Sequence, residues 1–315
     1  MSVSAPAAAM PSLTTSLVHE DDDEAVFYVP TNSFSYKQPE VPCHFFDRER
    51  EEILQTPRVT RTLDLDLSEE MGLTYPATTP NLLVRYVSIA PSDSLVTQFK
   101  ASAEIYCVLE GEGTSTAGGK TINWRAGDVF VFPGGQKTRH VAGSDGALLY
   151  EATDEPVLSF SGTRPSEVDS SSSVLHYAAD KIDEQIDRAY ARSENDEEVA
   201  KSVFFTSRKM ELTRTTTPWI ATNINTLDPA KDQRAHRHNA AAITLSLQGE
   251  GVHSLVDGQH VDWKPFGVMV TPPTALHSHH NRGTQRMRSF VVQDSGIYYY
   301  SRTTGFSFDQ AGEQP

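Results

Sequence analysis

An internal repeat constrains the fold of this chain more than any other feature. From Val87 onward, short alternating stretches are broken by Gly, Pro, Asp and Ser, a pattern typical of antiparallel β-strands. The same order of residues returns from Thr222. Matching residues lie 138 or 139 positions apart, as in Pro91 and Pro229, Gly111 and Gly249, Gly113 and Gly251, and Trp124 and Trp263. A register this steady indicates that one folding unit occurs twice.

Each repeat is predicted to be one β-barrel of the jelly-roll kind. The G-E-G triplets at 111–113 and 249–251 supply the backbone freedom of a tight hairpin, and Asp257-Gly258 marks another turn. Short strands with frequent turns favour a sandwich or barrel. The expected fold class is therefore all-β, with two jelly-roll barrels in tandem and a short linker helix.

The domain organisation follows from these repeats and from composition. Residues 1–24 are rich in Ser, Pro, Ala and acidic residues and are expected to form a flexible leader. The first barrel is assigned to residues 25–162, the linker and helix to 163–200, and the second barrel to 201–310.

Three shorter segments carry more local predictions. The polar run 164–173 is predicted to be a surface linker. Residues 175–192 are predicted to be a helix packed between the barrels, because Ile182 and Ile186 recur at helical spacing while charged residues fill the other face. The sequences FYVP and HFF, between residues 25 and 85, are interpreted as strands added to the edge of either barrel.

Net charge and cysteine content narrow the possible partners. A formal charge of −15 without a basic run disfavours nucleic acids and acidic membranes. No apolar stretch approaches the roughly 20 residues that span a bilayer. Two cysteines give no disulfide framework, so a reducing cytoplasm is the expected location. The partner is expected to be a small molecule.

Histidines are concentrated in the second repeat. Side chains at positions i and i+2 of a strand point to the same face, so His236 and His238 are both predicted to point into the barrel. His277 arrives after the turn that begins at Pro273. Three imidazoles from two adjoining strands can chelate one divalent ion and leave coordination positions open. We therefore predict a metal site at these three histidines, although an incidental H-x-H on a surface strand is the alternative.

The first repeat lacks these ligands. At an offset of 138 residues, His236 and His238 correspond to Gln98 and Lys100, and Thr138 stands where His277 stands. Glu104 and His140 are interpreted as core or rim residues. One metal per chain is expected, with none in the first barrel.

Four short motifs resemble the cupin superfamily, and more narrowly the bicupin ring-cleaving dioxygenases that act on gentisate, salicylate and 1-hydroxy-2-naphthoate. They are A-H-R-H at 235–238, G-E-G at 249–251, V-D-G at 256–258 and T-P-x-x-x-x-H-x-H at 271–279. The resemblance implies that three histidines hold Fe(II), with another divalent metal as the alternative. It also implies that O₂ is a co-substrate and that the chain forms a homo-oligomer.

This sequence departs from the family in two respects. The family usually carries its metal in the N-terminal barrel, whereas here the ligands lie in the second. Thr244 stands where the family has an arginine that helps to hold the substrate carboxylate. Since a hydroxyl has neither the charge nor the bidentate geometry of a guanidinium, gentisate is not the expected substrate.

Four further residues complete the expected site. His279 is a candidate proton donor or acceptor, with a rim role as the alternative. Asp294 matches an aspartate in a late strand of the family and is a catalytic candidate, with a surface turn as the alternative. Arg288 and Gln293 are candidates for substrate binding, together with Thr244.

The expected function is that of an Fe(II)-dependent dioxygenase that cleaves a small, oxygen-chelating, hydroxylated aromatic substrate with O₂. Redox-inert ions could not support this chemistry. Two other classes stay open: a metal-dependent isomerase, lyase or hydrolase that uses no O₂, and a non-catalytic bicupin that binds a small molecule. Fold alone does not decide among them.

Overall fold

A computed structural model describes residues 17–18, 26–166, 172–192 and 200–309. The chain divides into a short unit of residues 1–39 and a large unit of residues 40–315. In the short unit, β1 (Leu17–Val18) pairs with β2 (Val26–Phe27), and α1 (Pro30–Ser33) follows. FYVP is thus not a barrel edge strand, because β2 pairs with β1. Most of the predicted leader lies outside the described residues.

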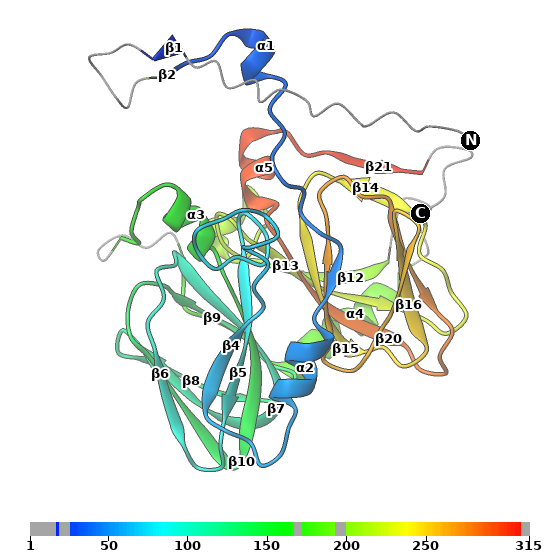
Figure 1. The fold of residues 1–315 in the computed structure, drawn as a ribbon. Coiled ribbons are helices and arrows are strands. Elements are labelled where there is room, and N and C mark those ends of the chain that lie inside the picture. Colours follow the sequence, from blue (N-terminus) through cyan, green and yellow to red (C-terminus); the bar gives the residue numbers. More distant parts are fainter. Residues whose placement is uncertain (1–16, 19–25, 167–171, 193–199, 310–315) are drawn as a thin grey trace, which may run out of the picture. The chain divides into compact units, whose positions relative to one another are not determined.

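The first repeat forms one continuous antiparallel sheet, coloured from blue through cyan to green in Figure 1. Its order is β11-β9-β7-β10-β5-β4, with β6 paired to β10 and β8 paired to β7. The bounds are β4 (Arg61–Asp64), β5 (Leu83–Ile89), β6 (Ser94–Thr97), β7 (Ala103–Ala117), β8 (Lys120–Arg125), β9 (Val129–Pro133), β10 (Thr138–Thr153) and β11 (Leu175–Tyr177). The long strands β7 and β10 run through the whole barrel, and their register shifts where Ala147 pairs with Gly111.

The second repeat divides the same architecture into two sheets, of order β12-β13-β20-β15-β18-β3 and β17-β16-β19-β14-β21. Its strands are β12 (Lys201–Phe205), β13 (Ala221–Leu227), β14 (His236–His238), β15 (Ala242–Gln248), β16 (Val252–Val256), β17 (Gln259–Asp262), β18 (Val268–Thr271), β19 (His277–Asn281), β20 (Met287–Gln293) and β21 (Phe306–Phe308). The predicted G-E-G turn at 249–251 lies between β15 and β16, where Gly251 has φ of 72°. The all-β prediction with two repeated units is confirmed.

One strand of the second barrel comes from the segment that precedes the first barrel in sequence. β3 (His44–Phe45) is the HFF segment, and it pairs with β18 of the second barrel although it precedes the first barrel in sequence. The backbone N–H of Phe46 donates to the carbonyl of Val268 at 3.0 Å. The first-barrel range of 25–162 therefore includes an edge strand of the second barrel.

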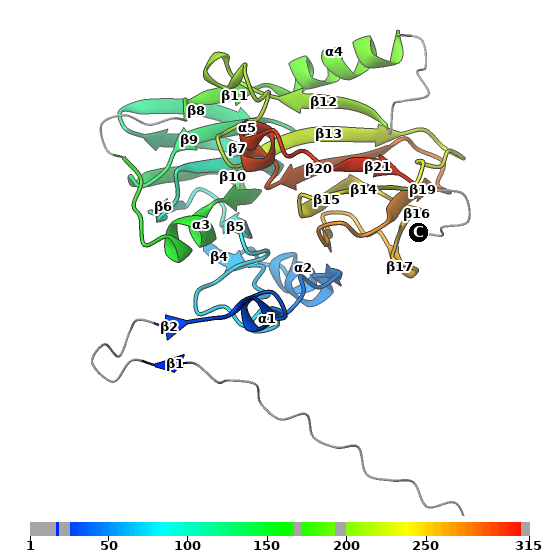
Figure 2. The same cartoon turned by 90° about the horizontal axis from the view of Figure 1, so that it is seen from above.

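The predicted linker helix begins later than its sequence pattern suggests. Leu175–Tyr177 form β11, which pairs with β9, and α4 spans Ala179–Tyr190. Asp128 fixes the start of the helix, because its carboxylate accepts the N–H of Ala179 at 2.8 Å. Figure 2 shows α4 lying along β12. Part of the polar run 164–173 lies outside the described residues.

A shared hydrophobic core joins the two barrels. Tyr150 of β10 and Phe290 of β20 make an edge contact with ring centroids 6.1 Å apart. Ile182 and Ile186 of α4 are buried in the same cluster, as their spacing predicts. Tyr86 donates its hydroxyl to the carbonyl of Phe266 in the other barrel at 2.5 Å. Burial of this apolar surface, at roughly 25 cal/mol per Å², holds the barrels together.

The remaining helices are short: α2 (Asp47–Ile53), α3 (Glu155–Phe160), η1 (Arg208–Met210) and α5 (Gly296–Ser301). Among the described residues, no helix has the length and apolar character that crossing a membrane requires.

Candidate metal centre

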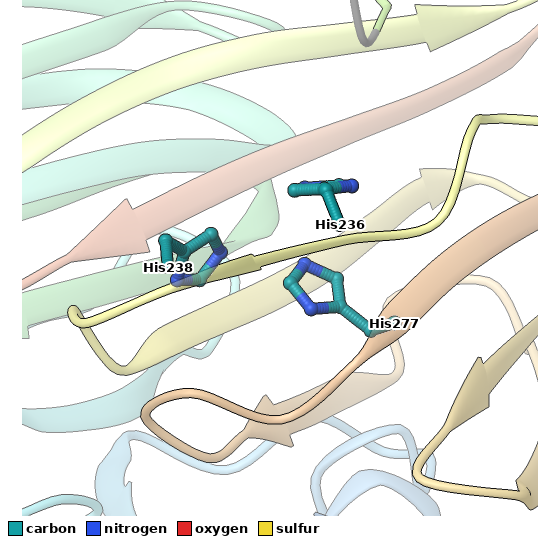
Figure 3. Close-up of side chains that lie close together, drawn as sticks. All are labelled: His236, His238 and His277. Carbon is teal, nitrogen blue, oxygen red and sulfur yellow. The ribbon is translucent and has the colours of Figure 1, made fainter. Parts of the chain in front are cut away.

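Three histidines from two adjacent strands converge in the second barrel. His236 and His238 lie on β14, and His236 is the direct partner of His277 on β19. One ligand atom from each lies within 4.8 Å of the others. Figure 3 shows the three rings gathered around one space. In the described part of the chain this is the one group of three or more potential ligands at such spacing.

Backbone carbonyls fix the tautomer of each ring. The Nδ1 atom of His236 lies 3.0 Å from the carbonyl of Arg234, that of His238 lies 2.8 Å from Ala240, and that of His277 lies 2.9 Å from Ala275. A carbonyl oxygen can only accept, so each Nδ1 must carry the proton. Each Nε2 therefore presents a lone pair, as a metal ligand requires.

Burial keeps these rings neutral. Desolvation lowers the pKa of His236 to about 4, and it lowers the pKa of His238 and, more strongly, of His277. Neutral imidazoles do not have to lose a proton before they bind a cation. The donor set thus suits a divalent transition metal, for which imidazole is a preferred ligand.

The predicted proton carrier His279 lies in a buried hydrogen-bond chain. Its Nδ1 atom lies 2.8 Å from the hydroxyl of Ser254, which accepts the indole N–H of Trp263 at 2.7 Å. His279 also lines the cavity beside the three ligands. Desolvation lowers its pKa to about 3, so it is neutral around neutral pH.

A cavity of about 200 Å³ adjoins the three ligands. Two of the predicted substrate contacts, Thr244 and Gln293, line it, and the Nε2 of Gln293 lies 3.3 Å from the Nε2 of His238. Both residues lie on strands of the sheet that faces β14, and both are brought to the site as expected.

Arg288 is not brought to this cavity, contrary to its assignment as a substrate contact. Gln293 and Val291 lie on the cavity face of β20, and alternation turns Arg288 to the other face. There its guanidinium pairs with Asp183 of α4 at 2.6 Å. It therefore contributes to docking the helix.

Asp294, the second predicted catalytic residue, does not line the cavity either. Its carboxylate accepts the N–H of Ala241 at 2.8 Å and the side-chain amide of Asn81 at 2.7 Å. Burial raises the pKa of Asp294 to about 6. These contacts hold the segment that links β14 to β15, which places His238.

Sequence reasoning missed the amide and aromatic residues of the cavity. Asn223 and Asn225 occupy alternate positions of β13, and an inward-facing N-x-N pair was a signal of the same kind as H-x-H. The C-terminal segment supplies Tyr298, Tyr299 and Phe306. Phe306 pairs with His238 in the strand register, and no periodicity in the sequence announces this pairing.

The strand register of the first barrel corrects the alignment of its residues with the three histidines. Thr97 is the partner of Thr138, as His236 is of His277. The equivalents of His236 and His238 are thus Thr97 and Phe99 rather than Gln98 and Lys100. A shift of one residue exchanges the two faces of a strand.

Comparisons with known proteins agree with this architecture. Residues 85–150 and 223–293 each match the cupin domain family. The chain is 36% identical over 81 residues to 5-aminosalicylate 1,2-dioxygenase of a Comamonas species, covering 26% of this chain and 22% of that protein. It is 37% identical over 65 residues to gentisate 1,2-dioxygenase of a Streptomyces species, covering 21% and 18%. The chain therefore aligns with about a fifth of the length of these two relatives.

The likeness in structure is more extensive. Salicylate 1,2-dioxygenase of Pseudaminobacter salicylatoxidans superposes with a TM-score of 0.71 at 12% identity, over 87% of this chain and 89% of that one. At this identity the comparison establishes a shared fold, which is that of two cupin barrels in one chain.

Proposed function

Because this chain is a bicupin with the fold of salicylate 1,2-dioxygenase, we propose that it is an Fe(II)-dependent ring-cleaving dioxygenase acting on a small hydroxylated aromatic compound. The observation that carries the proposal is the set of three Nε2 lone pairs, each oriented by a backbone carbonyl on Nδ1. The names of the relatives, a 5-aminosalicylate 1,2-dioxygenase and a gentisate 1,2-dioxygenase, support the reaction class.

The residues present fit a metal ion of this kind. His236, His238 and His277 would hold it as three neutral ligands on one side, leaving the other side open to the cavity. Bound there, Fe(II) supplies a Lewis acid and a source of electrons for O₂ chemistry, which a redox-inert ion lacks. The sequence-based prediction of one metal per chain is part of this proposal.

The chain's own side chains position the substrate. Gln293 lies beside His238 and is placed to donate its amide N–H to a substrate oxygen near the metal. Thr244 offers a hydroxyl on the same wall. His279 lines the same cavity and contacts Ser254, and we propose it as the proton donor or acceptor for a substrate hydroxyl.

A reducing, cytoplasmic location and a homo-oligomeric assembly belong to the same proposal. The two cysteines, Cys43 and Cys107, are both free, which fits a reducing compartment. The oligomer follows only from the resemblance to related bicupins, and light scattering of the purified protein would measure it.

The test is metal analysis after anaerobic purification, followed by oxygen uptake with a panel of ortho-hydroxylated aromatic compounds. About one iron per chain and substrate-dependent O₂ consumption are expected. Bound metal with turnover but no O₂ uptake would instead indicate an isomerase, lyase or hydrolase. Ligand binding without any turnover would indicate a binding protein.

A further inference from the structure

The cavity beside the three histidines has an uncharged wall. Among the described residues that line it, none is Lys, Arg, Asp or Glu. The polar part of the wall is made largely of side-chain amides and hydroxyls: Ser202, Asn223, Asn225, Gln233, Asn239, Thr244, Thr271, Gln293, Ser295 and Thr304. A substrate group that enters this space therefore meets dipoles and no counter-ion.

Charged residues close in sequence to the ligands are engaged elsewhere. Arg234 pairs with Asp309 at 3.2 Å and stacks on the ring of Phe308. Arg237, between the two ligands of β14, donates to the carbonyl of Thr274 at 3.0 Å. Neither guanidinium lines the cavity.

The amides are partly committed to holding the wall in place. Asn225 accepts hydrogen bonds from the hydroxyl of Ser202 at 2.5 Å and from the amide of Asn223. Asn239 donates to the carbonyl of Thr303 at 2.8 Å and accepts the N–H of Gly305 at 3.0 Å, which secures the segment before Phe306. These bonds make the neutral wall a built surface rather than a set of mobile side chains.

Among the described residues around the cavity, a bound metal would thus be the one positive charge available to a ligand. An anionic oxygen that coordinates the metal is compensated directly, but a carboxylate elsewhere on the ring would be buried without a cation. Leaving one charge of a pair buried and unpaired commonly costs 2–5 kcal/mol or more, which is about 30-fold or more in affinity.

Size and shape set a second limit. The volume of about 200 Å³ lies below the roughly 300–1,000 Å³ of drug-sized pockets, so it suits one aromatic ring. Aromatic side chains stand around the same space, namely Phe204, Tyr298, Tyr299 and Phe306. They offer faces and edges to an aromatic ring.

We propose that the substrate is a single-ring aromatic chelator whose charge lies entirely on the oxygen atoms that bind the metal, and whose remaining surface is neutral. This inference rests on the proposed function, because it assumes that the three histidines hold a divalent metal. It differs from that function in specifying the charge distribution of the substrate.

The experiment measures binding and requires no turnover. The protein is loaded with Zn(II), and calorimetric titration compares salicylate with its 5-carboxy and 5-carbamoyl derivatives, which have nearly equal size and differ in charge. We expect salicylate and the carbamoyl compound to bind with similar affinity and the carboxy compound about 100-fold more weakly. Equal affinity of the two derivatives would overturn the inference, as would failure of both to bind when salicylate binds.

Adding a positive charge to the cavity wall provides a second test. Thr244→Arg should make the carboxy compound bind better than the carbamoyl compound, whereas Thr244→Gln should keep the original order. Asn225→Arg, at a half-buried position of the wall, serves if Thr244→Arg fails to fold. An unchanged order in a folded arginine variant at either position would contradict the inference.

The two proposals fail in different ways. Charge-selective binding to the Zn(II) protein without O₂ uptake by the Fe(II) protein would refute the dioxygenase function and leave the charge distribution standing. Oxygen uptake by the Fe(II) protein, together with equal binding of the carboxy and carbamoyl compounds, would support the dioxygenase function and refute the charge distribution. Failure of salicylate and both derivatives to bind to the Zn(II) protein would overturn this inference.

Discussion

The two barrels share a buried hydrogen-bond chain but differ in what fills them. In the first barrel Trp124 donates to Ser115 at 2.7 Å, and Ser115 lies 2.7 Å from Nδ1 of His140. Trp263, Ser254 and His279 repeat this arrangement in the second barrel. The same series of hydrogen bonds occurs in the first barrel, which lacks the three histidines. The series is therefore part of the scaffold. His279 is thus first a structural residue, and any proton transfer would be an addition to that role.

The interiors show how the second barrel acquired space. Tyr106 pairs with Phe130 in the first barrel, and at the same place in the second Thr244 pairs with Met269. Glu104 opposite Phe132 likewise becomes Ala242 opposite Thr271. Each substitution is to a smaller side chain. The second barrel therefore differs from the first in interior volume as well as in its histidines.

The two barrels also differ in the charge that is buried inside them. In the first barrel the guanidinium of Arg85 is buried and contacts Asp64 at 2.6 Å, Glu151 at 3.1 Å and Glu155 at 2.5 Å. Its planar face also lies over the ring of Phe99, the equivalent of His238. The first barrel thus holds a buried guanidinium surrounded by carboxyl groups where the second holds a cavity lined by uncharged side chains.

The largest expected difference between the barrels is in metal binding. His236→Ala removes one of three ligands and should weaken metal affinity by more than about 100-fold, since loss of a supporting contact alone costs 10- to 100-fold. Activity should fall with it. His140→Ala is the matched control and should keep its metal. Elemental analysis measures the metal content of the wild type and both variants, and circular dichroism checks that all three are equally folded. Full metal occupancy in His236→Ala would contradict the site.

A second prediction fills the cavity of the second barrel with a side chain that the first barrel has at the equivalent position. Thr271→Phe introduces the residue that occupies the equivalent position, Phe132, and should lower ligand affinity by about 10- to 100-fold through overpacking. Metal content should be unchanged, because position 271 carries no ligand. Thr271→Val keeps the space and should bind nearly as the wild type does. Calorimetric titration of the Zn(II) protein measures both, and full affinity in Thr271→Phe would show that the cavity is not the binding site.

A third prediction separates scaffold from site. Ser115→Ala and Ser254→Ala should each lower the free energy of unfolding by about 1–3 kcal/mol, because each leaves a buried indole N–H without a partner. Only Ser254→Ala should also alter ligand affinity, since His279 lines the cavity. Denaturant unfolding and titration test this pair. Equal loss of ligand affinity in both variants would remove the distinction.

The last prediction concerns the pH dependence of stability. Burial, the largest cause, raises the pKa of Glu104 to about 7 and that of Glu151 to about 8, from 4.5. The folded state keeps protons that the unfolded chain releases, so this contribution to stability is fully present below about pH 4.5 and is lost as pH rises through 7 to 8.

Glu104→Gln should therefore reduce the fall in stability between these pH values, by at most about 1.4 kcal/mol per pH unit for one proton. Melting temperatures across the range test this. The exposed Glu112, on the same strand, gives the control Glu112→Gln, which should keep the wild-type slope. An unaltered slope in Glu104→Gln would show that this carboxyl does not bind the extra proton.

The sequence predicts the repeat and the convergence of His236, His238 and His277 because both depend on local spacing. It misplaces the first-barrel equivalents by one residue, because the G-E-G triplets lie 138 residues apart while the histidine-bearing strands and their equivalents lie 139 apart. The hairpin predicted at 111–113 is also wrong, since these residues lie inside β7. Asp294 was assigned from the family resemblance and Arg288 from its place in a late strand, and neither signal reveals the direction of a side chain. The start of α4 depends on Asp128, some fifty residues away, and no local pattern contains that contact.

The interlocking of the sequence halves limits how the molecule can be taken apart. β3 lies ahead of the first barrel, and its neighbours extend the contact, with Arg50 donating to the carbonyl of Pro265 at 2.6 Å and Lys264 pairing with Asp47 at 2.6 Å. A fragment that begins at the linker would lack β3 and would expose the unpaired edge of β18. Exposed strand edges promote aggregation, because they can pair with strands of other molecules. The half that carries the three histidines therefore cannot be separated by cutting at the repeat boundary. It needs β3, the first strand of the large unit, and the first barrel is the stretch of chain that connects β3 to the rest of the second barrel.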